Sequence, residues 1–198
     1  MSEFKSYSQY GEDTVLKNLI GNNGYFLEIG SYHPYIFSNT RFLVERGWCG
    51  CYVDGSSSAI ERFIEEYKNN NNIQIVNSLI GDKNDLIEFY DSIGDGISTT
   101  DIKHKNMWES TGSPFRKIYS NMINFDKLLS VLPETVDFIN IDVEGQSAYL
   151  ATLIDYNKVN TKVVCIEHDN AIEYLINHMK NYNFEYFWSN SCNIIFKK

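Results

Sequence analysis

The sequence predicts an α/β fold with a mostly parallel sheet, and three observations support this. Short apolar runs typical of buried strands recur along the chain, and stretches with the i, i+3, i+4, i+7 spacing of amphipathic helices lie between them. Such alternation is typical of strand–helix–strand units, whose strands pair in parallel. The last two apolar runs flank only a short polar turn, which indicates a hairpin. We therefore expect a seven-stranded, mostly parallel sheet with a C-terminal antiparallel hairpin.

Each element is predicted from its own run of residues. The expected strands cover 25–29, 51–53, 73–76, 136–141, 162–166, 184–188 and 193–196. Helical patterns are expected near 15–20, 38–47, 58–67, 128–132, 150–153 and 170–179. The predicted capping residues at helix starts are Ser38, Ser58 with Glu61, and Asn170 with Glu173.

Residues 86–125 break the alternation. LIEFY at 86–90 is typical of a strand, but the glycine-rich turn and the weakly periodic stretch after it match neither element. We interpret 86–125 as an insertion, partly mobile, over one edge of the sheet. Because no proline- or serine-rich linker divides the chain, residues 1–198 are expected to form a single domain.

The composition excludes several classes of function. The net charge of −9 disfavours nonspecific nucleic-acid binding and a polybasic membrane patch, since both need excess Lys and Arg. The polar start of the chain has no apolar segment typical of a signal peptide, and no apolar run is long enough to span a membrane. The four cysteines match neither a disulfide framework nor a zinc spacing, so we expect reduced core cysteines and a cytoplasmic protein.

Two strand ends carry residues that suit a ligand. Glu28 and Gly30 end the first strand, and Asp54 ends the second. In open α/β sheets ligands bind at this edge, and a carboxylate there can accept the hydroxyls of a ribose. The glycines that would hold a pyrophosphate are absent, which disfavours NAD. A nucleoside-containing cofactor without phosphates, such as S-adenosylmethionine, fits; the alternative is an ordinary turn after Gly30 and a helix-capping Asp54.

Four blocks of sequence carry a more specific signal. They are SQYGED at 8–13, GYFLEIGSYHPYIFSNT at 24–40 with RGWCGCYVDGSS at 46–57, DFINIDVEGQSAYL at 137–150, and SNSCNIIFKK at 189–198. In this order, and over nearly the whole chain, they resemble the FkbM-type methyltransferases. The resemblance implies a Rossmann-like class I methyltransferase fold with S-adenosylmethionine as the methyl donor.

The resemblance also implies a set of cofactor-binding residues. These are Glu28, Gly30 and Ser31 at the methionine end, Ser38 and Asn39 at its carboxylate, Asp54 and Ser56 at the ribose, Leu79 and Ile80 at the adenine, with Asp142, Gln9 and Tyr10 beside them. Ser38 and Asn39 precede a predicted helix, whose N-terminus favours anions. Gln9 and Tyr10 either cover the cofactor or only pack the N-terminal segment onto the sheet.

Transfer to a hydroxyl requires removal of its proton, and several residues are candidates for this role. His168 follows the strand 162–166 and is our first candidate for a general base. Asp142 is the next candidate, as a base or as a negative charge against the sulfonium, and His33 is a third. His104 is expected on the mobile insertion and His178 on a helix surface.

A metal-dependent mechanism is an alternative. Asp142, Asp169 and Asn170 follow two neighbouring strands, and their spacing resembles the magnesium site of catechol-type O-methyltransferases. Oxygen ligands of this kind suit Mg²⁺ or another divalent cation, which would lower the pKa of the acceptor hydroxyl. The alternative for Asn170 is a helix cap.

The resemblance further implies O-methylation of a sugar hydroxyl in a glycan or its precursor as the expected activity. The insertion carries Trp108, Phe115, Arg116 and Tyr119, which either form a lid over the acceptor or only pack the insertion down. The alternatives are methylation of a nonsugar small molecule and a catalytically inactive cofactor-binding domain. The expected partners are therefore a sugar or other small-molecule acceptor, and the sequence leaves a homo-oligomer open.

Overall fold

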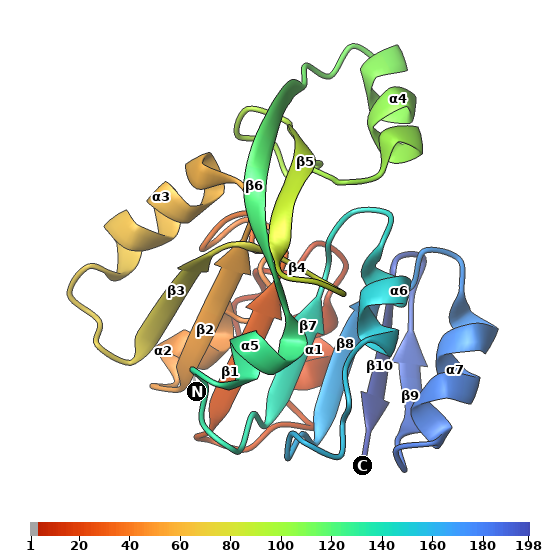
Figure 1. The fold of residues 1–198 in the computed structure, drawn as a ribbon. Coiled ribbons are helices and arrows are strands. Elements are labelled where there is room, and N and C mark those ends of the chain that lie inside the picture. Colours follow the sequence, from red (N-terminus) through yellow and green to blue (C-terminus); the bar gives the residue numbers. More distant parts are fainter. Residues whose placement is uncertain (1–3) are drawn as a thin grey trace.

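The computed structural model describes residues 4–198 (Figure 1). The helices are α1 (Glu12–Leu16), α2 (Arg41–Glu45), α3 (Ser57–Tyr67), α4 (Ile102–Ser110), α5 (Phe125–Leu129), α6 (Ser147–Thr152) and α7 (Ile172–Lys180). The strands are β1 (Tyr25–Ile29), β2 (Cys49–Asp54), β3 (Ile73–Asn77), β4 (Leu79–Gly81), β5 (Asp85–Asp91), β6 (Arg116–Asn124), β7 (Phe138–Ile141), β8 (Val163–Glu167), β9 (Glu185–Ser189) and β10 (Asn193–Lys197).

The main sheet has seven strands in the order β3-β2-β1-β7-β8-β10-β9. The first five strands in this order pair in parallel, and β10 is antiparallel to both β8 and β9. This arrangement confirms the predicted fold class. The chain winds from β1 outward to β3 and then returns to β7 on the other side of β1, so the strand order reverses between β1 and β7. Open α/β sheets bind ligands at such a reversal, outside the carboxyl ends of the strands.

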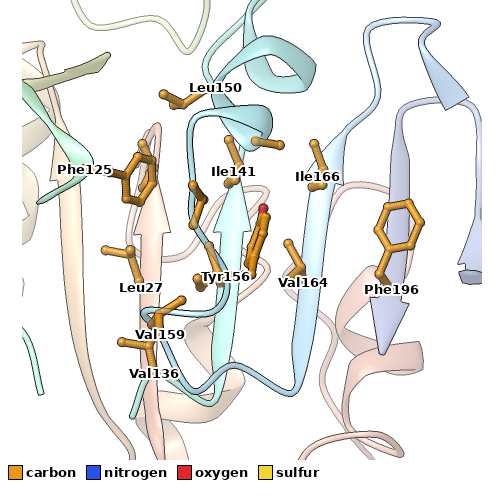
Figure 2. Packing of buried hydrophobic residues seen from close by; sticks show 14 of the residues in the cluster. Leu27, Phe125, Val136, Ile141, Leu150, Tyr156, Val159, Val164, Ile166 and Phe196 are labelled. Carbon is orange, nitrogen blue, oxygen red and sulfur yellow. The ribbon is translucent and has the colours of Figure 1, made fainter. Parts of the chain in front are cut away.

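Alternating side chains of each strand build a core on each face of the main sheet. One face packs Leu27, Ile141 and Ile166 against α5, α6 and α7, and Figure 2 shows Ile141, Val164 and Ile166 in this cluster. The opposite face packs residues such as Phe26 against α1, α2 and α3. Because both faces are covered, the central strands are continuous apolar runs, and this is why they could be identified from the sequence.

The segment expected as a partly mobile insertion is a second sheet. β6 pairs in parallel with β4 and in antiparallel along the whole of β5, from Asp85 opposite Met122 to Asp91 opposite Arg116. This three-stranded sheet and α4 stand over the carboxyl ends of the main strands (Figure 1). The sequence predicted only the strand at 86–90. β6 escaped prediction because its exposed and half-buried residues give no continuous apolar run.

Two predicted capping motifs are wrong. α3 begins after Ser56, which makes no side-chain cap; its hydroxyl donates to Asp91 Oδ1 at 2.7 Å instead. α7 begins only after Ala171, because Asp169 and Asn170 have left-handed backbone angles with φ of 47° and 61°. At α2, by contrast, the Ser38 hydroxyl accepts a hydrogen bond from the Arg41 N–H at 3.0 Å.

Two further expectations concern the cysteines and the length of the helices. All four cysteines are free; Cys51 and Cys165 are buried, whereas Cys49 and Cys192 are partly exposed, so the expectation of four core cysteines is wrong for these two. Within 4–198, every helix is too short or too polar to cross a bilayer.

Candidate active site

A pocket opens at the carboxyl ends of β1, β2 and β7, under the second sheet and the loop that leads to α4. The main sheet contributes residues from all three strand ends. We call the second sheet, α4 and the loop between them the cover of the pocket. The cover contributes residues of β4, β5, β6 and the loop 95–100 to the lining. The pocket therefore lies at the strand-order reversal that the topology identifies as the ligand-binding edge.

One end of the pocket is built around Asp54. Its Oδ1 accepts a hydrogen bond from the Ser56 N–H at 2.6 Å. Burial raises the pKa of the Asp54 carboxyl to about 7, and the nearby Asp91 charge adds to this rise. The remaining acceptor capacity suits neighbouring hydroxyl groups, because their donation favours the ionised carboxylate.

Beside Asp54 the pocket wall is apolar. Leu79 and Ile80 of β4 line it together with Phe89 of β5 and Met122 of β6. The carbon side chain of Leu79 lies over Gly55, where a Cβ would be only 2.3 Å from Leu79 Cδ2. This wall offers a flat aromatic ring a dry surface next to a hydroxyl-binding carboxylate.

Gly30 sits where the ends of β1 and β7 meet. Its φ is +84°, and a Cβ at this position would lie 1.5 Å from the backbone oxygen of Asp142. Only glycine therefore allows the two strand ends to approach this closely. The pocket follows this junction, with Gly30 and Asp142 both in its lining.

Three carboxyl groups gather beyond this junction. Asp142 and Glu167 are hydrogen-bond partners, and burial together with the Glu167 charge holds the pKa of Asp142 well above its usual range. Burial and the Glu144 charge raise the pKa of Glu167 to about 7. Asp142 and Glu167 therefore do not readily ionise together. Glu144 lies beside them in the lining of the pocket, and three neighbouring carboxyl groups suit a positively charged group.

Several predicted cofactor residues lie behind the pocket and not in its lining. Glu28 is buried, accepts from the Thr40 hydroxyl, and has a pKa raised by burial to about 7. The Ser31 hydroxyl donates to the Glu28 backbone oxygen at 3.1 Å, and Asn39 donates to Asn140 at 3.1 Å. With Ser38, which caps α2, these residues fix the strand ends from beneath.

The N-terminal pair Gln9 and Tyr10 lies outside the lining of the pocket. Gln9 Nε2 donates to the Tyr10 hydroxyl at 3.3 Å, and the Tyr10 ring is 50% exposed. The Tyr10 hydroxyl lies near Cys192, which sits in the turn between β9 and β10. Of the two alternatives for this pair, the geometry favours packing of the N-terminal segment.

His168 has both ring nitrogens occupied. Its Nδ1 accepts from the Asn170 N–H at 3.1 Å, so the proton is assigned to Nε2, which faces the Asn190 backbone oxygen at 3.3 Å. The side chain is buried and does not line the pocket. This geometry gives His168 no free nitrogen for an acceptor. His33 also lies outside the lining of the pocket, and its Nδ1 accepts from the Tyr35 N–H at 3.0 Å.

The proposed metal ligands do not fit a cation site. Asp169 Oδ2 accepts from the Ala148 N–H at 2.9 Å, at the start of α6. The Asp142 carboxyl is engaged by a hydrogen bond with that of Glu167, as described above. Within residues 4–198, no group of three or more His, Cys, Asp or Glu side chains is arranged to hold a metal ion. We therefore derive no step through a metal.

The structure adds site residues that sequence reasoning missed. His104, which was expected on a mobile insertion, lies with its Nε2 3.1 Å from Glu144 Oε2. Tyr32, Gln146 and Tyr149 line the pocket. Tyr149 and Gln146 belong to the same block as Asp142, so their position gave a signal; His104 gave none, because its helix is far from that block in sequence.

Comparison with known proteins assigns the chain to a family. No curated protein sequence matches it significantly. Among solved structures, it is similar to a chain in the crystal structure of a fibrillarin/Nop5p complex, with 12% identity, a TM-score of 0.44, and coverage of 93% of this chain and 77% of that chain. The Methyltransferase FkbM domain matches residues 28–186, which include β1 to β9 in part or whole and the pocket residues described above. The chain belongs to the FkbM methyltransferase family.

Proposed function

We propose that this methyltransferase transfers the methyl group of S-adenosylmethionine to a sugar hydroxyl, in a glycan or its precursor. When bound, S-adenosylmethionine supplies the methyl group from a positively charged sulfonium. The observation that carries the proposal is the order of groups along one pocket: an apolar wall, a hydroxyl-binding carboxylate, a glycine junction and a carboxyl cluster. The first two match adenine and ribose, and the glycine junction with the carboxyl cluster matches the positively charged sulfonium and the methionine chain beyond it.

The residues divide into two roles under this proposal. Gly30, Asp54, Ser56, Leu79, Ile80 and Asp142 line the pocket and would contact the cofactor. Glu28, Ser31, Ser38 and Asn39 would act behind them by fixing the strand ends. Asp142 is proposed for the sulfonium end as part of the carboxyl cluster, since its own carboxyl is engaged by a hydrogen bond with Glu167. His168 is proposed as a structural residue of the hairpin turn.

The charge of the pocket supports an uncharged acceptor. Its lining includes the acidic residues Asp54, Asp82, Asp95, Asp142 and Glu144, and among the described residues it includes no Lys or Arg. A phosphate group entering this space would meet like charge without a compensating donor, whereas a hydroxyl can donate to a carboxylate. A sugar hydroxyl fits this chemistry. The free cysteines support our proposal of a cytoplasmic location.

Calorimetry with S-adenosylmethionine tests the donor half of the proposal. We expect the wild type to bind, and Asp54→Ala to lose about 10–100-fold in affinity, because a hydrogen bond to a charged group contributes about 1.5–3 kcal/mol. Asp126→Ala is the matched control, since Asp126 is exposed on α5 and pairs with Lys158. Absent binding by the wild type, or equal affinity in Asp54→Ala, would contradict the assignment of the pocket.

Incubation with methyl-labelled donor tests the acceptor half. The panel should contain glycans, nonsugar alcohols and amines, and an RNA oligonucleotide. We expect label in a glycan and none in RNA, because the net charge of −9 repels a phosphate backbone. Label in a nonsugar compound alone would favour the first alternative. Binding of the donor without transfer to any compound would favour an inactive cofactor-binding domain.

A further inference from the structure

The α4 side chain His104 contacts a residue that lines the pocket. His104 Nε2 lies 3.1 Å from Glu144 Oε2, in the loop that follows β7. The Thr99 hydroxyl donates to the Glu144 backbone oxygen at 2.9 Å. Gly145 lies against the imidazole so closely that a Cβ there would be 2.9 Å from His104 Nδ1. Residue 144 is therefore held by the cover at both its backbone and its carboxylate.

The backbone at Glu144 is strained. Its φ is +53°, in the left-handed region, and Gly145 follows with a φ of +84°. A residue with a long side chain costs roughly 1–2 kcal/mol in this region relative to ordinary angles. Such strain persists when surrounding contacts determine it, and it concentrates at functional sites. Here the contacts of Thr99 and His104 are the ones that hold it.

We propose that Glu144 receives the proton of the acceptor hydroxyl and that His104 is the residue that positions its carboxylate. This inference rests on the proposed function, because it concerns the acceptor end of the same pocket. In the reaction, the acceptor oxygen forms a bond to the methyl carbon while the carbon–sulfur bond breaks and its electron pair stays on sulfur. The hydroxyl proton passes to the Glu144 carboxylate and leaves to solvent after product release.

Access from the pocket favours Glu144 over the neighbouring titratable groups. It lines the pocket, its side chain is 24% exposed, and no other carboxyl hydrogen-bonds it. The Asp142 carboxyl is instead engaged by a hydrogen bond with the carboxyl of Glu167. His104 does not line the pocket, and its two nitrogens face Gly145 on one side and Glu144 and Trp108 on the other. Its action on the acceptor therefore goes through Glu144.

The rate of transfer tests the role of Glu144. We expect Glu144→Gln to reduce kcat about 100-fold or more, the range of a lost general base, while the affinity for S-adenosylmethionine changes less than about threefold. Glu144→Asn is a second variant, because asparagine tolerates a left-handed backbone and also lacks the carboxylate. Glu109→Gln is the control on α4, since Glu109 pairs with Lys105. A kcat within threefold of wild type in a folded Glu144 variant overturns the proposal.

Two substitutions of His104 separate positioning from packing. His104→Phe keeps a ring but removes the donor, and we expect kcat to fall about tenfold with little change in the KM of the acceptor. His104→Gln keeps an N–H donor and should recover most of that loss. Equal kcat in both variants and the wild type overturns the positioning role. Equal loss in both variants also overturns it, because the donor would then be irrelevant.

A nuclear magnetic resonance spectrum of the free protein tests the pair of His104 and Glu144 in the absence of the methyl donor and the methyl acceptor. In ¹⁵N-histidine-labelled protein, we expect the Nε2 resonance of His104 to shift in Glu144→Gln and to stay unchanged in Glu109→Gln. An unchanged resonance in Glu144→Gln overturns the pairing. If the wild type methylates no compound, the proposed function fails and the role of Glu144 as a base fails with it. If the wild type is active and Glu144→Gln equals it, only the present inference fails.

Discussion

The floor and the cover of the pocket are built in different ways. The floor consists of β1, β2 and β7, whose residues are buried on both faces of the main sheet. The cover consists of the second sheet and α4, and no residue of α4 is buried. The floor is held by apolar packing, whereas a polar contact between His104 and Glu144 connects α4 to it. Local opening concentrates where buried apolar contacts are few, so the cover is the part expected to move.

Several polar contacts of the cover involve the loop that follows β5. Arg62 of α3 donates to the backbone oxygens of Tyr32 and Gly94, which ties the loop after β5 to the loop after β1. Ser98 and Ser56 both donate to Asp91 Oδ1. Each contact is individually weak, with net contributions near 1 kcal/mol. The floor is therefore fixed by apolar packing, whereas the loop after β5 and α4 are held by a few hydrogen bonds.

The largest effect is expected for Gly30→Ala in the floor. The new Cβ would lie 1.5 Å from the Asp142 backbone oxygen, at a φ of +84°. We expect a loss of about 3 kcal/mol or more in unfolding free energy, since overpacking and a left-handed alanine both contribute. Urea unfolding measures it. The matched change in the cover is Gly112→Ala, with a φ of +99° and no atom within 4 Å of the Cβ.

Gly112→Ala should lower the unfolding free energy by only the cost of placing alanine in the left-handed region, about 1–2 kcal/mol. The pair of variants separates steric clash from conformational strain, because both glycines have a positive φ. Comparable losses in the two variants would show that the close approach of β1 and β7 adds nothing, and would undo the contrast between a rigid floor and an adjustable cover.

The second effect is expected for Asp54→Asn, and it depends on pH. Because burial raises the pKa of Asp54 to about 7, the folded protein binds this proton more tightly than the unfolded chain, whose Asp pKa is ~3.9. Wild-type stability therefore falls as the pH rises from about 4 to about 7. The asparagine of the variant would not titrate and keeps an oxygen for the Ser56 N–H. We expect the variant to be more stable than wild type at pH 8, by up to roughly 4 kcal/mol.

The gap between these two proteins should shrink as the pH falls and close near pH 4. Thermal unfolding across this range measures it. Asp126→Asn, at an exposed carboxylate of α5, is the control variant. A gap that stays constant with pH would mean that Asp54 is not the titrating group in the floor.

The contrast also explains what the sequence reveals. β1, β2, β7 and β8 are apolar runs, and each carries an acidic residue in or directly after its last two positions, so both the strands and their chemical ends are local features. The acidic residues are Glu28, Asp54, Asp142 and Glu167. β6 and the contact between His104 and Glu144 are not local: β6 is half exposed, and the two residues are distant in sequence. Likewise nothing near His168 indicates that the Asn170 N–H and the Asn190 backbone oxygen occupy its ring.

The third largest effect is expected for His104→Phe. It is measured as the free energy of local opening of α4. The hydrogen bond to Glu144 raises the pKa of His104, and the charges of Glu144, Glu167 and Asp101 add to this against the opposing effect of burial. The stabilisation that this pair gives the folded protein is therefore fully present below the pKa of histidine in the unfolded chain, ~6.5. It is lost as the pH rises through the pKa of His104 in the folded protein. Hydrogen-exchange protection of α4 should drop by about 1 kcal/mol at pH 6 and by less at pH 9. An equal drop at both values would contradict the ion pair.

The smallest effect is expected for Trp108→Phe, and its pH dependence has the opposite sign. Trp108 Nε1 lies 2.9 Å from the same His104 Nε2 that faces Glu144. That nitrogen cannot donate to Glu144 and accept from Trp108 at once, because a protonated imidazole nitrogen has no lone pair to offer. At pH 6 the proton on Nε2 serves Glu144, so the indole donor contributes little. At pH 9 the neutral ring can accept from Trp108, and its loss should lower protection of α4 by about 0.5 kcal/mol. Protection measured at both pH values in the two single variants and the double variant checks this. A Trp108→Phe loss that is larger at pH 6 would show that Glu144 and Trp108 do not compete for one nitrogen.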